Sequence, residues 1–214
     1  MAQRVEANLY VELDGQLQEI KRQLRQSSGY PFDPEKLKIA LQGIVEGRFD
    51  NGKVAESILE FVGTVAIQAL PKFVAKDNFA QNTGEKAKVK ISYVGDNFKA
   101  WFGDKIEEPV AEHTLRYAKL LKSSVDGPIR AEIGADHEET TLGAVHALMG
   151  LQPNGEDGVL LKNGYANIFY VKDVGGTLQA VRVGWDDDGW NVSASSVTNP
   201  GGWGDGYQVF SRNS

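Results

Sequence analysis

The sequence predicts an α+β protein built from three consecutive parts. These are an N-terminal helical unit (residues 1–75), a central segment with a hairpin and helices (76–150), and a C-terminal antiparallel β meander or small barrel (151–214). Before residue 75 the apolar residues recur at helical spacing, whereas from residue 88 they alternate with polar residues. The last third also places Asn-Gly and Asp-Gly turns between short apolar runs, which is typical of β-hairpins.

Three helices are expected in the first part. The first, over 13–27 and ending near Ser28-Gly29, has an apolar face formed by Leu13, Leu17, Ile20 and Leu24. The second begins at Asp33-Pro34-Glu35, where an N-cap, a first-turn proline and an early acid coincide, and it stops near Gly47. The third, over 52–70, carries apolar residues at helical spacing and is closed by Pro71.

The central part is expected to begin with a hairpin over 88–102, because apolar and polar residues alternate on both sides of Gly95-Asp96-Asn97. Residues 114–121 fit a strand and a helix almost equally well, and we favour the strand. A short helix is expected to follow Pro128 as far as Ile133, and another over 141–149. The Gly-, Asn- and Pro-containing stretch 151–158 is the best linker.

Up to five antiparallel strands are expected after this linker, over residues 159–161, 166–172, 178–185, 190–197 and 208–211. The Asp186-Asp187-Asp188-Gly189 turn joins the third to the fourth. Ile168 and Tyr170 lie on the face of their strand opposite Phe169 and Val171. Part of this strand should therefore be covered on both sides.

Composition excludes several functional classes. The chain has 214 residues, 41% of them hydrophobic, and a formal net charge of −6. The acidic balance argues against a partner held mainly by phosphate neutralisation, so nucleic-acid binding is disfavoured but stays open. The absence of cysteine excludes disulfides, thiolate nucleophiles and Cys-based metal sites.

The longest apolar run, Phe61–Leu70, is too short to span a bilayer. Because no secretion signal opens the chain, a cytoplasmic location is expected.

No residue pattern points to catalysis, and we predict no catalytic residue, metal site or cofactor. His113, His137 and His146 lack the spacing of a zinc-binding helix. Asp186-Asp187-Asp188 lacks the distal glutamate of a calcium loop. The glycine-rich 201–206 segment leads into a strand rather than a helix, unlike a phosphate-binding loop. Enzymatic activity remains uncertain and disfavoured, with a metal-dependent hydrolase as the weakest alternative.

Two surfaces suggest binding instead. The apolar face of the first helix, Leu13, Leu17, Ile20 and Leu24, is expected to contact a protein partner or a second copy of the chain. Trp203, Trp190 and Tyr207 are candidate ligand contacts, because sugars and unpaired bases stack on aromatic faces. The leading hypothesis is a non-enzymatic interaction protein. A carbohydrate-binding or single-stranded nucleic-acid-binding module is the alternative.

Four segments, 13–23, 29–37, 123–129 and 209–214, occur in the same order in a group of uncharacterised bacterial proteins, which this chain resembles over most of its length. The resemblance implies a bacterial, cytoplasmic origin. No fold, activity or site residue is known for the group, so the resemblance implies nothing about chemistry.

Overall fold

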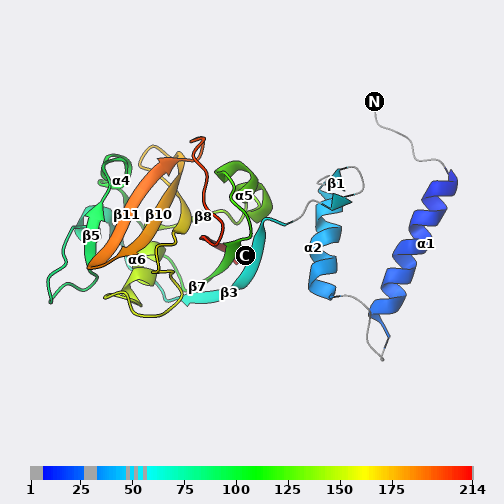
Figure 1. The fold of residues 1–214 in the computed structure, drawn as a ribbon, viewed down its shortest axis with the longest axis horizontal. Helices are drawn as coiled ribbons and strands as arrows, with labels where there is room; N and C mark the ends of the chain where they lie inside the picture. The colour runs from blue at the N-terminus through cyan, green and yellow to red at the C-terminus, as the bar shows by residue number, and fades with distance from the viewer. Residues whose placement is uncertain (1–6, 27–32, 47–48, 51–52, 55–56, 214) are drawn as a thin grey trace. The chain divides into compact units, whose positions relative to one another are not determined.

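The computed structural model describes residues 7–26, 33–46, 49–50, 53–54 and 57–213 (Figure 1). The chain divides into two units, residues 1–56 and 57–214. Strands from 76–150 and from 151–214 join a single sheet in the second unit, so these two segments do not form separate sheets.

The described residues of the N-terminal unit form two helices and a small two-stranded sheet: α1 (Ala7–Leu24), α2 (Pro34–Val45), β1 (Phe49–Asp50) and β2 (Lys53–Val54). The start predicted for α2 is confirmed, since the Asp33 carboxylate accepts hydrogen bonds from the backbone N–H groups of Glu35 and Lys36 at 3.0 and 3.4 Å. The helix ends predicted near Ser28-Gly29 and Gly47 lie outside the described residues. In the described part of the chain, no helix combines the length and the apolar character needed to cross a membrane.

The second unit is built on an eight-stranded mixed sheet. Its strands are β3 (Leu59–Ile67), β5 (Ile91–Val94), β7 (His113–Leu120), β8 (Glu139–Thr140), β9 (Asn167–Lys172), β10 (Leu178–Asp186), β11 (Gly189–Ser196) and β12 (Gln208–Arg212). The helices of this unit are α3 (Ala75–Asn78), α4 (Asp96–Phe102), α5 (Asp126–Ile133) and α6 (Leu142–Gly150). A separate pair joins β4 (Phe73–Val74) to β6 (Ile106–Glu107).

The strand order is β3-β7-β12-β9-β10-β11-β5, with β8 also paired to β9. β12 and β8 run parallel to β9, and β5 runs parallel to β11, while the other pairs are antiparallel. Because β3 and β5 form opposite ends of this order, the sheet is open. The predicted small barrel is therefore wrong, although β9, β10 and β11 do form a short meander.

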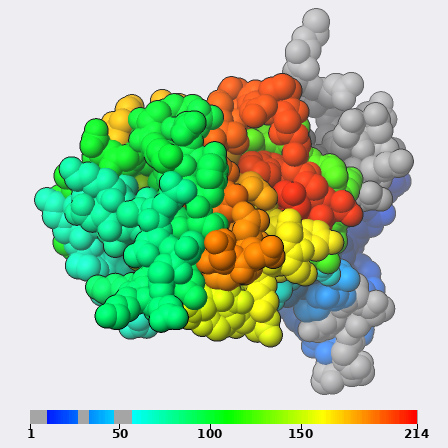
Figure 2. Space-filling view, turned by 60° about the vertical axis from the view of Figure 1, so that its left-hand side comes forward, coloured from blue at the N-terminus to red at the C-terminus, as the bar shows by residue number. Residues whose placement is uncertain are grey.

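Hydrophobic clusters cover both faces of the sheet. Phe169 and Val171 pack with residues of α3, α4 and α6 on one face. Ile168 and Tyr170 pack with residues of α5 on the other. The prediction that β9 is covered twice is confirmed. Figure 2 shows the orange β10–β11 region at the surface beside the green segment that contains β5 and α4.

Two expected elements are wrong, for a shared physical reason. Described residues 59–67 of the expected 52–70 helix form β3, which pairs along its length with β7. Residues 96–102, expected as a strand, form α4 behind an N-cap at Gly95. Phe98 and Phe102 are both buried, and their spacing of four residues places them on one face of a helix as well as on one face of a strand. Each stretch satisfies both periodicities, and packing against distant strands decided between them.

Most of the other local predictions are confirmed. Residues 113–120 form β7, and α6 lies where it is expected. The helix expected after Pro128 begins earlier, at Asp126, and ends at Ile133 as expected. Strands β10 and β11 pair with Trp185 opposite Trp190 and Asp186 opposite Gly189, so the triple-Asp segment is the hairpin turn. Residues 159–161 are not a strand. The backbone N–H of Leu160 instead donates to the side-chain carbonyl of Gln152 at 2.8 Å.

Candidate functional site

The four predicted partner-binding residues lie on α1, and their side chains reach solvent. Leu13, Leu17 and Leu24 are 45%, 46% and 40% exposed, and Ile20 is half-buried. We call these four residues the α1 apolar face. A row of large apolar side chains left open to water is a feature of helices that pack on a partner.

Polar residues on other sides of α1 bind one another. The Arg22 guanidinium donates to both carboxylate oxygens of Glu19 at 2.7 and 2.6 Å, and the Gln23 amide donates to Glu19 at 2.9 Å. These hydrogen bonds, that of Arg22 first, lower the pKa of Glu19 to about 2. Such pairs support the helix itself and leave the α1 apolar face unobstructed.

Gly15 gives a direct test of how strongly α1 is formed. A Cβ atom built on Gly15 meets no atom within 4 Å. Replacing Gly15 by alanine is expected to stabilise the helix by about 0.5–1 kcal/mol, since glycine has more backbone freedom to lose. Hydrogen exchange of the α1 amides should slow in the variant. Gly134→Ala is the control and should destabilise the chain, because Gly134 has a φ of +89°. Unchanged or faster α1 exchange in Gly15→Ala would contradict the expectation.

Trp203, the predicted ligand contact, is half-buried and bound to the protein. Its indole N–H donates to the Asp126 carboxylate at 2.7 Å, and its backbone forms a bridge with Ser124 through hydrogen bonds of 2.7 and 3.1 Å. The glycine-rich loop is therefore fastened to the start of α5. Tyr207 packs against Trp203, with ring centroids 6.4 Å apart, and against Tyr165 at 6.1 Å.

Asp126 is the central residue of this region and is only 1% exposed. One of its carboxylate oxygens accepts from both Trp203 and the Tyr170 hydroxyl, at 2.7 and 2.8 Å, while the other has no hydrogen-bond partner among the described residues. Burial raises the pKa of Asp126, although the two hydrogen bonds act in the opposite direction. Burial, together with the neighbouring carboxylate, also raises the pKa of Tyr170.

A charged pair lies one helical turn from Asp126. Arg130 donates to both oxygens of Glu138 at 2.7 and 2.9 Å, and Glu138 is nearly buried. This geometry is the bidentate arrangement that arginine favours. The hydrogen bonds to Glu138 are the main reason that the pKa of Arg130 is raised. The arrangement fixes α5 to the segment before β8.

Trp190, the third predicted ligand contact, lies on the other face of the sheet. It is fully buried, and its indole N–H donates to the backbone carbonyl of Gln152 at 3.1 Å. Its ring packs edge-on against Trp185 at a centroid distance of 5.1 Å. A ligand cannot reach Trp190 in the folded domain. The structure therefore brings Trp203 and Tyr207 together and keeps Trp190 apart.

The three histidines lie in different surroundings. His146 packs against the rings of Phe73 and Phe79, and burial lowers its pKa. His113 is the first residue of β7, and its ring nitrogen Nδ1 lies 3.0 Å from the carbonyl oxygen of Ala111. His137 follows the end of α5. In the part of the chain that the structure describes, no three His, Asp or Glu side chains are grouped as metal ligands would be.

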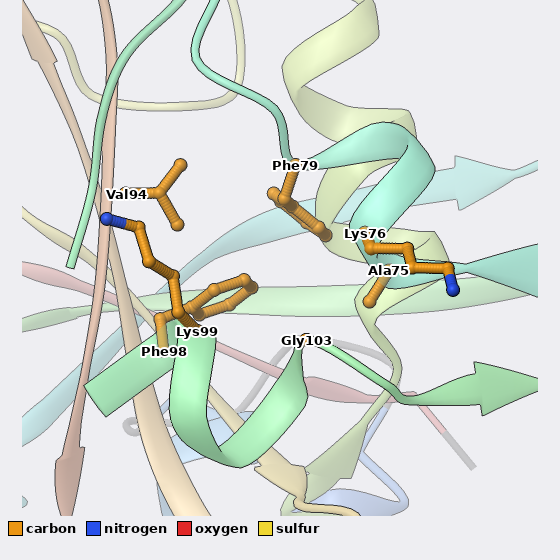
Figure 3. A pocket seen from close by; sticks show the side chains of 7 residues that line it. All are labelled: Ala75, Lys76, Phe79, Val94, Phe98, Lys99 and Gly103. Carbon is orange, nitrogen blue, oxygen red and sulfur yellow. The ribbon is translucent and has the colours of Figure 1, made fainter. Parts of the chain in front are cut away.

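A small apolar pocket lies between α3 and α4 (Figure 3). Phe79, Phe98 and Val94 form its apolar wall, and Lys76 and Lys99 stand on either side with their ammonium groups directed away from each other. Its volume is about 150 Å³, well below the roughly 300–1,000 Å³ of pockets that hold drug-sized ligands. The pocket has room for a single apolar side chain, and Lys76 and Lys99 are its only charged lining residues.

Sequence reasoning missed Asp126, Tyr170 and Gln152. Asp126 directly precedes the Gly127-Pro128 turn signal, and Tyr170 lies on a strand that is predicted to be covered on both faces. Gln152 is buried, and its amide binds the backbone of Glu156 and Leu160, so the expected linker is a folded segment. No local pattern in the sequence marks Asp126, because its partners Tyr170 and Trp203 lie 44 and 77 positions away.

Comparison of the chain with protein-family models, with curated proteins and with solved structures gives no match.

Proposed function

We propose that this chain is a non-enzymatic cytoplasmic interaction protein that binds a helix of a partner protein through the α1 apolar face. One observation carries the proposal: three leucines of this face are 40–46% exposed at coiled-coil spacing on one helix. Most of the stability of a helix in a protein comes from packing of its apolar face, so this 18-residue helix gains from a partner that covers that face. Glu19, Arg22 and Gln23 bind one another, so these polar side chains do not cover the α1 apolar face.

The experiment is an affinity capture from a lysate of the source cell, using the full chain and a Leu17→Asp, Leu24→Asp variant. A control variant, Val11→Asp, Gln18→Asp, adds two acids at the same spacing to exposed positions on another side of α1. A partner captured by the native chain and the control, and lost with the first variant, is the expected result. Equal capture by all three chains, or no capture by any, would contradict the proposal.

A carbohydrate-binding surface is the second candidate function. Tyr165, Tyr207 and Trp203 form a continuous aromatic row, and Tyr165 is 41% exposed. Sugars stack on such rings, and the net charge of −6 favours them over nucleic acid. Binding to a glycan array should be lost in Tyr165→Ala and kept in Tyr10→Ala, which removes an exposed tyrosine of α1. Absence of any binding by the native chain would exclude this candidate.

A further inference from the structure

The α1 apolar face has the spacing of a two-stranded coiled coil. Its four residues follow one another at intervals of four, three and four positions. This sequence of intervals alternates between the a and d positions of a heptad, with Leu17 and Leu24 at a, and Leu13 and Ile20 at d. Tyr10 occupies the preceding a position, and it is also exposed. A seam of this kind fits another helix with the same repeat.

We infer that the helix bound by the α1 apolar face is α1 of a second copy of this chain, lying antiparallel to the first. This inference rests on the proposed function and names its partner. An antiparallel pair sets a positions against d positions. Leu13 then meets Leu24 of the second copy, Leu17 meets its Ile20, and the two-fold symmetry repeats both contacts. All four residues of the face are used in four successive layers, and none is left without an apolar neighbour.

The residues that flank the seam complement each other in the same register. Asp14 and Lys21 occupy successive e positions, and both are exposed. Antiparallel helices bring e positions together, so Asp14 lies opposite Lys21 of the second copy and Lys21 lies opposite its Asp14. On the other flank the g positions carry the uncharged residues Gln16 and Gln23, so no charge repels the second copy there.

A parallel pair would not gain these contacts. Parallel helices bring e positions against g positions, and no g position of α1 carries an acidic or a basic residue. The charge pattern therefore favours one partner and one direction. Charges at such flanking positions set the choice and orientation of partners in coiled coils.

The test measures the size of the full chain by sedimentation equilibrium across a range of concentrations. The chains compared are the native one, Asp14→Lys, Lys21→Asp, the double variant, and the control Glu12→Lys, which makes the same charge change at an exposed position away from the seam. The native chain and the control should dimerise alike. Each single reversal should raise the dimer dissociation constant roughly tenfold, because two attractions become two repulsions. The double variant, and an equimolar mixture of the two single variants, should recover native affinity.

Several results would overturn the inference. These are a native chain that remains monomeric, single reversals no weaker than Glu12→Lys, or a double variant that does not recover. A monomeric native chain that still captures a cellular partner through Leu17 and Leu24 would overturn the second copy as partner and leave the proposed function standing. A dimer that survives Leu17→Asp, Leu24→Asp would overturn the inference, and the capture experiment would then decide the proposed function by itself.

Discussion

Replacing Trp190 by alanine is expected to destabilise the 57–214 unit by about 3–5 kcal/mol, the largest effect of any substitution considered for this chain. Trp190 is fully buried and belongs to β11, the strand that lies between β10 and β5 in the sheet. Its ring packs edge-on against the ring of Trp185. Its removal leaves a large cavity. The backbone carbonyl of Gln152, which accepts a hydrogen bond from the indole N–H, also loses its donor. Urea denaturation followed by far-UV circular dichroism measures the loss.

Trp190→Phe separates the two contributions to this loss. The phenyl ring fills part of the cavity but cannot donate to Gln152, so a smaller cost of about 1–3 kcal/mol is expected. If Trp190→Ala lowers the free energy of unfolding no more than Trp190→Phe does, the packing of the Trp190 ring contributes less to stability than its burial suggests.

Replacing Asp126 by alanine is expected to cost about 2–4 kcal/mol of folding free energy. The Tyr170 hydroxyl and the Trp203 indole N–H both donate to this carboxylate, and both would lose their acceptor. Asp126→Asn is the matched control. Its amide oxygen can still accept both hydrogen bonds, and an uncharged group costs less to bury, so a change below about 1.5 kcal/mol is expected. Equal losses in the two variants would contradict this account.

Asp126 also predicts a dependence of stability on pH. Because burial raises its pKa in the folded chain above the ordinary aspartate value of about 4, the folded state holds this proton more tightly than the unfolded state. The contribution of Asp126 to stability is therefore greatest at low pH. It falls as the pH rises from the ordinary value through the raised folded value, and it is constant above that.

The pH effect is measured as the difference in unfolding free energy between the native chain and Asp126→Asn. Other carboxylates contribute equally to both chains, so they cancel in this difference. Relative to the variant, the native chain should lose stability as the pH rises above about 4. A difference that is flat or that grows with pH would show that the pKa of Asp126 is not raised.

The sequence by itself determined those features whose causes lie within a few residues. Asp33, Pro34 and Glu35 begin α2 through contacts inside one helical turn. The 186–189 turn set the register of β10 against β11. The α1 apolar face was also available from spacing alone, since a single helix displays its own periodicity.

Only the tertiary structure decided which distant residues meet. Residues 59–67 form β3, which pairs with β7, and residues 96–102 form α4, which packs Phe98 and Phe102 into the core cluster shared with α3 and α6. Asp126 and Trp203 are 77 positions apart, and Gln152 and Trp190 are 38 apart. Such pairs follow from strand order and register, which depend on burial over the whole domain. Local periodicity records which face a residue occupies, but not which distant residue lies across from it.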